Sequence, residues 1–289
     1  GGGVGAPPVD MPPAPLTPPT KGGAYEKSIA MFEESAKEPT LAQKYQQAIS
    51  KLPDHVRGFQ EGMLDRFAGI NALSKESERR VSQLGGMGDA QLQAVTDVAK
   101  TIKAALGQGF PDVTKQVDAY LHMIQAVDIA AEKGSGRLFP GGFKGSEAAQ
   151  GLTDMKNSLG ETKWHAVEAA GQAAIAESKA TLQMQVDAGL ITQDFADMLL
   201  SKYGHYNQQN IIRETEEMLK GNGGKRISVT SANIKRLTEE GTTKGRTSAY
   251  ASVLGSRADT VGLIMRNDTA KQVAQDAIAN GLGKRIAGT

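Results

Sequence analysis

Aliphatic residues recur every three or four positions over most of the chain, and this periodicity is the feature that most constrains the fold. One such stripe runs through residues 54–73, another through 113–131 and a third through 160–186. This spacing puts apolar side chains on one face of an α-helix. Glycine and proline clusters separate the stripes, so that neighbouring helices can turn back on each other. We therefore predict an all-α fold, an elongated multi-helix bundle with long antiparallel neighbours.

The composition agrees with helices and removes several kinds of chemistry. Aromatic residues make up 5% of the chain and hydrophobic residues 39%, which favours aliphatic helical cores over an aromatic-rich sheet sandwich. The chain has no cysteine, which excludes disulfides, thiolate nucleophiles and cysteine-based zinc sites. No run of about 18 apolar residues occurs, so we expect no segment to span a bilayer as a helix.

The stretch from Gly189 to Asn207 predicts a tight corner between two helices. Gly189 suits the left-handed residue that ends one helix, and Thr192 suits the N-cap of the next. Two tyrosines and a histidine follow close to another glycine. We expect the aromatic rings of Tyr203, His205 and Tyr206 to plug this corner while their polar tips stay in water.

Glycine clusters and capping residues place the other boundaries. We expect Asp89 to cap the helix after the run of glycines at 85–88, a break at Gly160, and a last strong helix from 256 to 278. The loop at 134–145 should be anchored by its two phenylalanines, Phe139 and Phe143.

Composition also divides the chain into three parts. Residues 1–23 hold most of the prolines and should be an extended Pro/Gly-rich linker without a core of its own. Such a strip needs a neighbouring surface to hold it, which favours a chain embedded in a larger assembly. Residues 24–219 are expected to form a helical domain, and residues 220–289 a basic, Gly-containing helical region. The start at Gly1 resembles no signal peptide and suggests a piece of a longer polypeptide.

Basic residues concentrate at the end of the chain. Residues 220–289 hold 12 Lys and Arg against 5 Asp and Glu, whereas residues 1–219 hold 21 against 27. A basic stretch interleaved with Ser, Thr and Gly can contact phosphates without sequence preference. A solvated surface, or one that faces the acidic part of a neighbouring copy, explains the same charges. The predicted nucleic-acid contacts are Lys225, Arg226, Lys235, Arg236, Lys244 and Arg246, and the basic set continues with Arg257 and Arg266.

Signatures of catalysis are missing from the sequence. Gly136 and Gly141 have the spacing of a P-loop, but Gly142 stands where its lysine should be. No Gly-x-Ser-x-Gly elbow occurs. The four histidines are dispersed without the spacing of a helical metal pair, and we expect each to be solvated or satisfied in the core. We therefore predict no enzyme activity, no cofactor and no metal; the histidines are His55, His122, His165 and His205.

Several short motifs follow one another along the chain. They are Leu64–Ala68, Tyr120-Leu121 with Gly136–Gly142, Val186–Thr192, Tyr203–Tyr206, and Lys244–Thr247 with Arg266-Asn267. In this order they resemble the helical regions of giant phage virion polypeptides and of the related large polyvalent proteins of mobile elements, and the likeness covers roughly residues 54–278. The motif at Tyr203–Tyr206 departs from the family pattern, because Asn207 and two glutamines follow where the family usually has Pro and Arg.

The resemblance implies a structural role in a virion. In short-tailed phages such polypeptides are internal virion or ejection proteins, packed near the portal and expelled with the genome to help it across the host envelope. For this chain it implies a homo-oligomer that contacts other virion proteins of the portal or core, touches DNA nonspecifically, and forms part of a conduit for genome delivery. Its location would be the virion, and the host cell envelope after ejection.

Two other interpretations remain open from the sequence. The chain is alternatively a noncatalytic helical region of a large multienzyme polypeptide of phage or mobile-element origin that acts on DNA. Helicase or methylase motifs in the flanking sequence would favour that hypothesis. A third interpretation is a soluble helical adaptor, which predicts a free monomer.

Overall fold

The structure is a computed structural model of the 289-residue chain. It describes residues 22–35, 74–107, 113–136, 138–139, 141–206 and 248–281. The predicted helix at 54–73 and nearly all of the proline-rich strip at 1–23 lie outside these ranges. The division into three parts therefore stays a prediction.

The described residues are almost entirely helical, which confirms the predicted all-α class. Two-residue strands form the only ladder among them. The elements are α1 (Ala24–Ser35), α3 (Lys75–Gln83), the 3-10 turn η1 (Leu84–Gly86), α4 (Met87–Leu106), α5 (Thr114–Lys133), β1 (Leu138–Phe139), β2 (Phe143–Lys144), α6 (Gly145–Asp187), α7 (Gln193–Lys202) and α10 (Ala249–Ala279).

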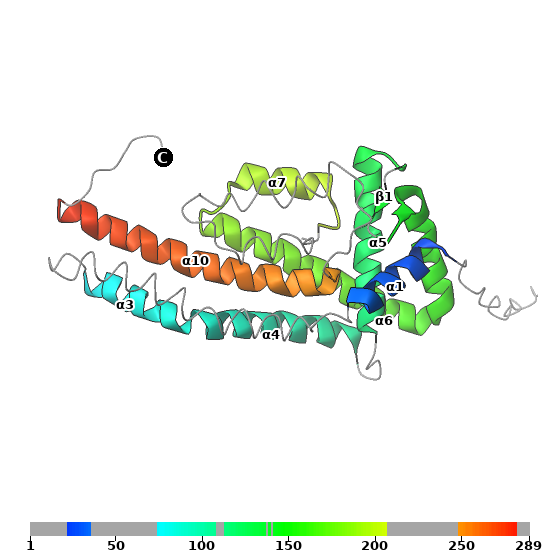
Figure 1. The fold of residues 1–289 in the computed structure, drawn as a ribbon, viewed down its shortest axis with the longest axis horizontal. Helices are drawn as coiled ribbons and strands as arrows, with labels where there is room; N and C mark the ends of the chain where they lie inside the picture. The colour runs from blue at the N-terminus through cyan, green and yellow to red at the C-terminus, as the bar shows by residue number, and fades with distance from the viewer. Residues whose placement is uncertain are drawn as a thin grey trace, which may run out of the picture.

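The helices form an elongated body with a broad end and a rod (Figure 1). Helix α5, helix α1 and the first part of α6 make up the broad end. From there α10 runs outward beside α3 and α4, which run in the opposite direction. The second part of α6 lies on the other side of α10, and α7 returns above it toward α5. Helix α10 packs against both α4 and α6, and these two helices also contact each other directly.

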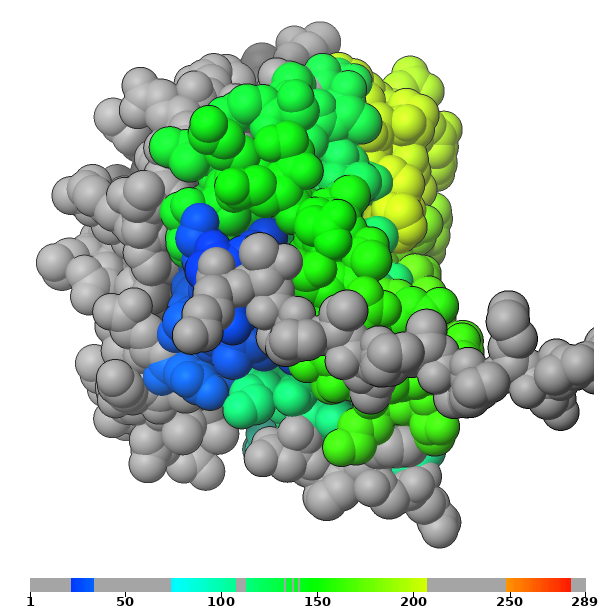
Figure 2. Space-filling view, turned by 90° about the vertical axis from the view of Figure 1, so that its right-hand side faces the viewer, coloured from blue at the N-terminus to red at the C-terminus, as the bar shows by residue number. Residues whose placement is uncertain are grey.

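Helix α1 closes the broad end of the molecule. It packs against α5, α6 and β2, and Figure 2 shows it in blue against the green surface of these elements. Ala24 and Tyr25 are buried there, at 2% and 8% exposure. Burial of apolar area by these side chains stabilises the contact.

Two separate apolar clusters stabilise the bundle. The larger one fills the broad end with residues of α1, α4, α5, the first two thirds of α6 and the start of α10. Within it the rings of Tyr120 and Trp164 meet edge to face, with centroids 5.8 Å apart. The smaller cluster holds Leu182 of α6 together with Ala196, Leu199 and Tyr206 from α7 and the turn after it. The predicted aliphatic stripes at 113–131 and 160–186 are therefore surfaces that pack.

The glycine boundaries of α6 agree with the sequence. Gly160 has φ 71° and ψ 163°, so the long helix α6 consists of two helices joined by a kink. The loop before α6 forms a short hairpin in which Phe139 pairs with Phe143. Both rings are buried and stack with centroids 5.7 Å apart, as expected for anchors of this loop.

Two predicted boundaries were wrong. Asp89 is not an N-cap: α4 begins at Met87 after Gly86, and Asp89 lies in its first turn, where its charge still suits the helix dipole. The last helix begins at Ala249 rather than near 256, because Ser248 caps it and accepts a hydrogen bond from the Ala251 amide. Gly255, near the start of α10, does not break this helix.

Gly171 marks the closest approach between α6 and α5. It is buried on α6, and a Cβ built at this position would overlap the ring of Tyr120. The hydroxyl of Tyr120 accepts a hydrogen bond from Gln172 Nε2 at 2.8 Å. The ring is therefore fixed at both its face and its tip, and only a residue without a side chain fits beneath it.

Substituting Gly171→Ala should destabilise the protein, because the added methyl overpacks the ring of Tyr120. Overpacking of this kind costs about 1–3 kcal/mol of unfolding free energy. The matched control is Gly255→Ala in α10, where a Cβ meets nothing within 4 Å. That substitution should stabilise the helix by up to about 1 kcal/mol. Urea unfolding of both variants measures the difference, and equal effects would contradict the packing.

Candidate functional site

The predicted phosphate contacts lie outside the described residues, with the set Lys225, Arg226, Lys235, Arg236, Lys244 and Arg246. The two arginines that follow them are described: Arg257 binds within the bundle, and Arg266 is exposed and bonds to its own helix. Arg257 donates to Glu177 Oε2 at 2.6 Å and to Thr181 Oγ1 at 2.8 Å, and its side chain is 16% exposed. Arg266 donates to the carbonyl of Gly262 at 3.1 Å. Arg257 therefore belongs to a helix contact and not to an exposed basic surface.

The three described histidines have different surroundings. His122 is buried beside the ring of Phe143, with centroids 5.0 Å apart. His165 is exposed on α6 between Glu161 and Glu168, at 3.9 and 3.5 Å. His205 follows α7 and faces α5. His122 is thus a core histidine and His165 a solvated one, and His55 lies outside the described residues.

The corner between α6 and α7 folds largely as its sequence predicts. Gly189 has φ 66°, the left-handed conformation that few other residues adopt. Thr192 Oγ1 accepts a hydrogen bond from the Phe195 amide at 3.3 Å and so caps α7. The expectation that the tyrosine tips stay in water is wrong for Tyr206, which is 7% exposed. Burial raises the pKa of its phenol to about 12.

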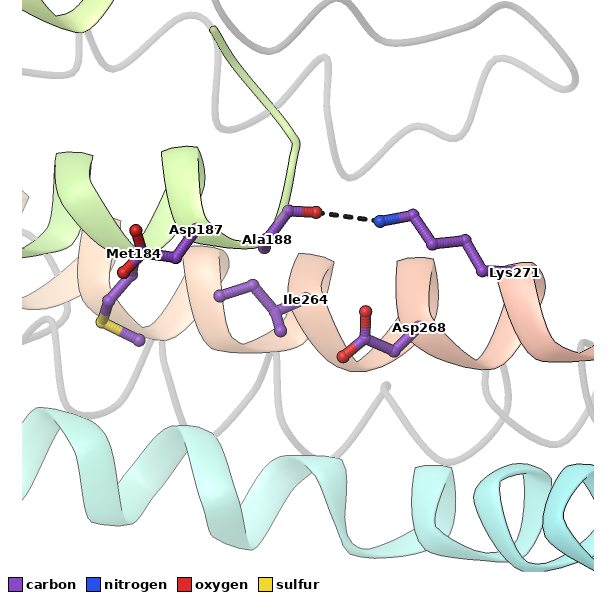
Figure 3. A pocket seen from close by; sticks show the side chains of 6 residues that line it. All are labelled: Met184, Asp187, Ala188, Ile264, Asp268 and Lys271. Atoms are coloured by element: carbon purple, nitrogen blue, oxygen red, sulfur yellow. Dashed lines mark hydrogen bonds between the residues drawn. The ribbon is translucent and has the colours of Figure 1, made fainter. Parts of the chain in front are cut away.

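A shallow, open hollow of about 350 Å³ lies where α6 ends against α10 (Figure 3). Apolar side chains of Met184 and Ile264 meet there with charged ones of both signs. Lys271 reaches across it and donates to the carbonyl oxygen of Ala188 at 3.0 Å. This contact places an ammonium at the C-terminal end of α6, where the helix dipole favours positive charge. The lining residues are Met184, Asp187, Ala188, Ile264, Asp268 and Lys271.

Three carboxylates each accept a hydrogen bond from a backbone amide of a distant segment. The most buried is Asp118 of α5, at 1% exposure. Its Oδ1 accepts hydrogen bonds from Ser248 Oγ at 2.6 Å and from the Tyr250 amide at 3.0 Å. These groups form the first turn of α10, whose amides have no partner within the helix. Asp118 therefore fixes the start of α10 on α5.

Asp276 does the same near the other end of α10. Its Oδ2 accepts from the Ser74 amide at 2.6 Å and from Ser77 Oγ at 2.5 Å, at the N-terminus of α3. Burial opposes its ionisation, but the hydrogen bonds from Ser77 and Ser74 outweigh burial and lower the pKa of Asp276. The carboxylate thus fixes α3 against α10.

Asp128 of α5 holds the chain that leaves α7. Its Oδ2 accepts from the His205 amide at 2.6 Å, and its Oδ1 lies 2.9 Å from His205 Nδ1. Nearby, Lys202 pairs with Glu132 of α5 at 3.3 Å. The carboxylate and the imidazole resemble two members of a hydrolytic triad, but their contacts serve to attach the end of α7 to α5.

Sequence analysis did not identify these three carboxylates. Asp118 and Asp128 lie inside the predicted helix at 113–131, and aspartate disfavours helix interiors because its side chain competes for backbone groups. That unfavourable placement was a signal. It indicates a tertiary role without saying which segment each carboxylate caps.

Among the described residues, no three His, Asp or Glu side chains gather as a metal site. None of the described helices is long and apolar enough to cross a bilayer. No protein-family model, curated protein or solved structure matches this chain. The hydrogen bonds of Asp118, Asp276, Asp128 and Arg257 join different helices of the bundle.

The contact between Asp276 and α3 should weaken in acid. Because the pKa of Asp276 is lower in the folded chain than its ordinary value of 3.8, the ionised carboxylate favours folding at neutral pH. That contribution is lost as the pH falls below about 3.8 through the lowered pKa. Unfolding free energies of wild type and Asp276→Asn should differ at pH 7 and converge as the pH falls below 3.8. A difference that is independent of pH would contradict this assignment.

Proposed function

We propose that this chain is a structural helical segment of a phage internal virion protein, which assembles with copies of itself and with portal or core proteins and helps form a conduit for DNA. The proposal rests on one observation: polar side chains in the described bundle bind other elements of the same bundle. Asp118, Asp128 and Asp276 cap distant elements, and Arg257 joins two helices. Side chains with these tasks support a scaffold better than a reaction.

The order of the motifs connects this scaffold with virions. The corner at Val186–Thr192, one of the motifs that resemble the virion polypeptides, is the turn at which α6 ends and α7 begins. Structural polypeptides of this kind bury aliphatic stripes against one another and against neighbouring molecules. The location in a virion is inferred from the resemblance, and the packed helices are consistent with a structural role there.

Charge supports a contact with DNA. Residues 220–289 carry an excess of seven basic side chains over acidic ones, whereas the rest of the chain is acidic. Phosphate contacts by lysine and arginine need no particular base sequence and suit a conduit through which any genome segment passes. The acidic remainder would leave the bound DNA confined to one part of the surface.

Native mass measurements with and without duplex DNA, across a salt series, test the proposal. We expect an oligomer that binds DNA and whose affinity falls steeply with salt, with a slope of roughly −5 in log K against log salt if six phosphates are contacted. Replacing Lys225, Arg226, Lys235, Arg236, Lys244 and Arg246 by Gln should flatten that slope.

The control is Arg257→Gln, which removes a basic residue that binds Glu177 in the bundle. It should leave the salt slope unchanged, apart from any loss of stability. A free monomer without affinity for DNA at low salt would contradict both the assembly and the conduit.

A further inference from the structure

The end of α6 and α7 form a hairpin, residues 176–206, that shares no apolar cluster with the outer part of α10. The larger cluster includes α6 only as far as Ile175 and α10 only as far as Leu254, and the hairpin touches it at Tyr203, which packs against both clusters. The smaller cluster begins at Leu182 and contains residues of α6, α7 and the adjoining turns, without a member from α10. The hairpin therefore has its own small core.

Mainly polar contacts join this hairpin to α10, besides the apolar side chains of Met184 and Ile264 that meet in the hollow. Arg257 donates to Glu177 and Thr181, and Gln185 Nε2 donates to Thr260 Oγ1 at 2.8 Å. Farther out, the carbonyl of Ala188 accepts from Asn267 Nδ2 at 3.3 Å and from Lys271 Nζ at 3.0 Å. The contacts follow the two helices along their length, and the hollow of Figure 3 lies at the outer end of this polar seam.

A polar seam is held more weakly than an apolar interface of equal size. When it opens, water replaces each hydrogen bond, so the net loss is only about 0.5–1.5 kcal/mol for a neutral bond. A partly buried ion pair such as Arg257–Glu177 gains little because its desolvation offsets its attraction. Separating an apolar interface would instead expose surface at about 25 cal/mol per Å².

The base of the hairpin carries two hydroxyls that bond back to the carbonyl four residues earlier, as several other hydroxyls of the described helices do. Ser178 Oγ donates to the carbonyl of Ala174 and Thr181 Oγ1 to that of Glu177, a pattern that bends helices. The returning end stays attached to α5 through Asp128 and His205. Both ends of the hairpin are thus held at the broad end of the molecule, while its tip at Gly189 is tied to α10 by polar contacts.

We propose that the hairpin of residues 176–206 lifts from α10 as a unit, pivoting near Ser178 and breaking the seam while its own core and its attachment to α5 persist. The open form exposes a polar face of α10 around Arg257 and Thr260. This motion belongs to the described fold and does not depend on the proposed virion role.

Distances between spin labels test the motion, and the absence of native cysteine makes the labelling specific. Labels at Gln193→Cys, at the tip, and Leu92→Cys, on the exposed side of α4, report on the hairpin. We expect the distribution of distances between these two labels to have a short major peak and a longer minor peak. Arg257→Ala should raise the ratio of long to short roughly tenfold, since it leaves the Glu177 carboxylate partly buried without a partner in the closed form. Arg266→Ala, which leaves the seam intact, should not change the ratio.

A second label pair and a urea series make the result decisive. Labels at Leu92→Cys and Ile278→Cys lie on α4 and α10 and should keep one distance in every variant. In the otherwise native protein, the fraction of molecules with the longer hairpin distance should grow at urea concentrations that leave the helical circular dichroism signal unchanged. A single hairpin distance that persists until the helices melt would overturn the proposal.

Discussion

The buried carboxylate of Asp118 is the interaction on which the arrangement of the helices depends most. Helix α10 contacts α3, α4, α5 and α6, so its direction decides how both sides of the rod are placed. Asp118 sets that direction by binding the first turn of α10, and it does so from inside the larger core. A buried carboxylate costs several kcal/mol unless it is hydrogen-bonded. The capped turn of α10 supplies those bonds, and each group depends on the other.

The same arrangement recurs and explains why an all-helical chain with few aromatic residues has one defined packing. Asp276 fixes α3 on α10, and Asp128 fixes the end of α7 on α5. Apolar stripes alone allow helices to slide or rotate against each other at little cost in free energy. A carboxylate that must meet particular amides specifies the register, at a cost in desolvation.

Sequence reasoning recovered what depends on local physics. The helical class follows from spacing, the kink at Gly160 and the end of α6 at Gly189 follow from glycine's freedom at positive φ, and Thr192 follows from capping chemistry. It failed where a distant group decides. Asp118 and Ser248 are 130 residues apart in sequence, and no local pattern joins them. Tyr206 was placed in water because its burial comes from tertiary packing with α6 and α7.

A double-mutant cycle between Asp118→Ala and Ser248→Ala tests most directly whether α10 is held in this way. The hydroxyl of Ser248 donates to the carboxylate at 2.6 Å. If the two side chains stabilise the fold through their contact with each other, the double variant should lose less stability than the sum of the single variants, with a coupling energy of about 1–3 kcal/mol. Additive losses, within about 0.5 kcal/mol, would show that the bond between Ser248 and Asp118 does not help to hold α10 and would contradict the account.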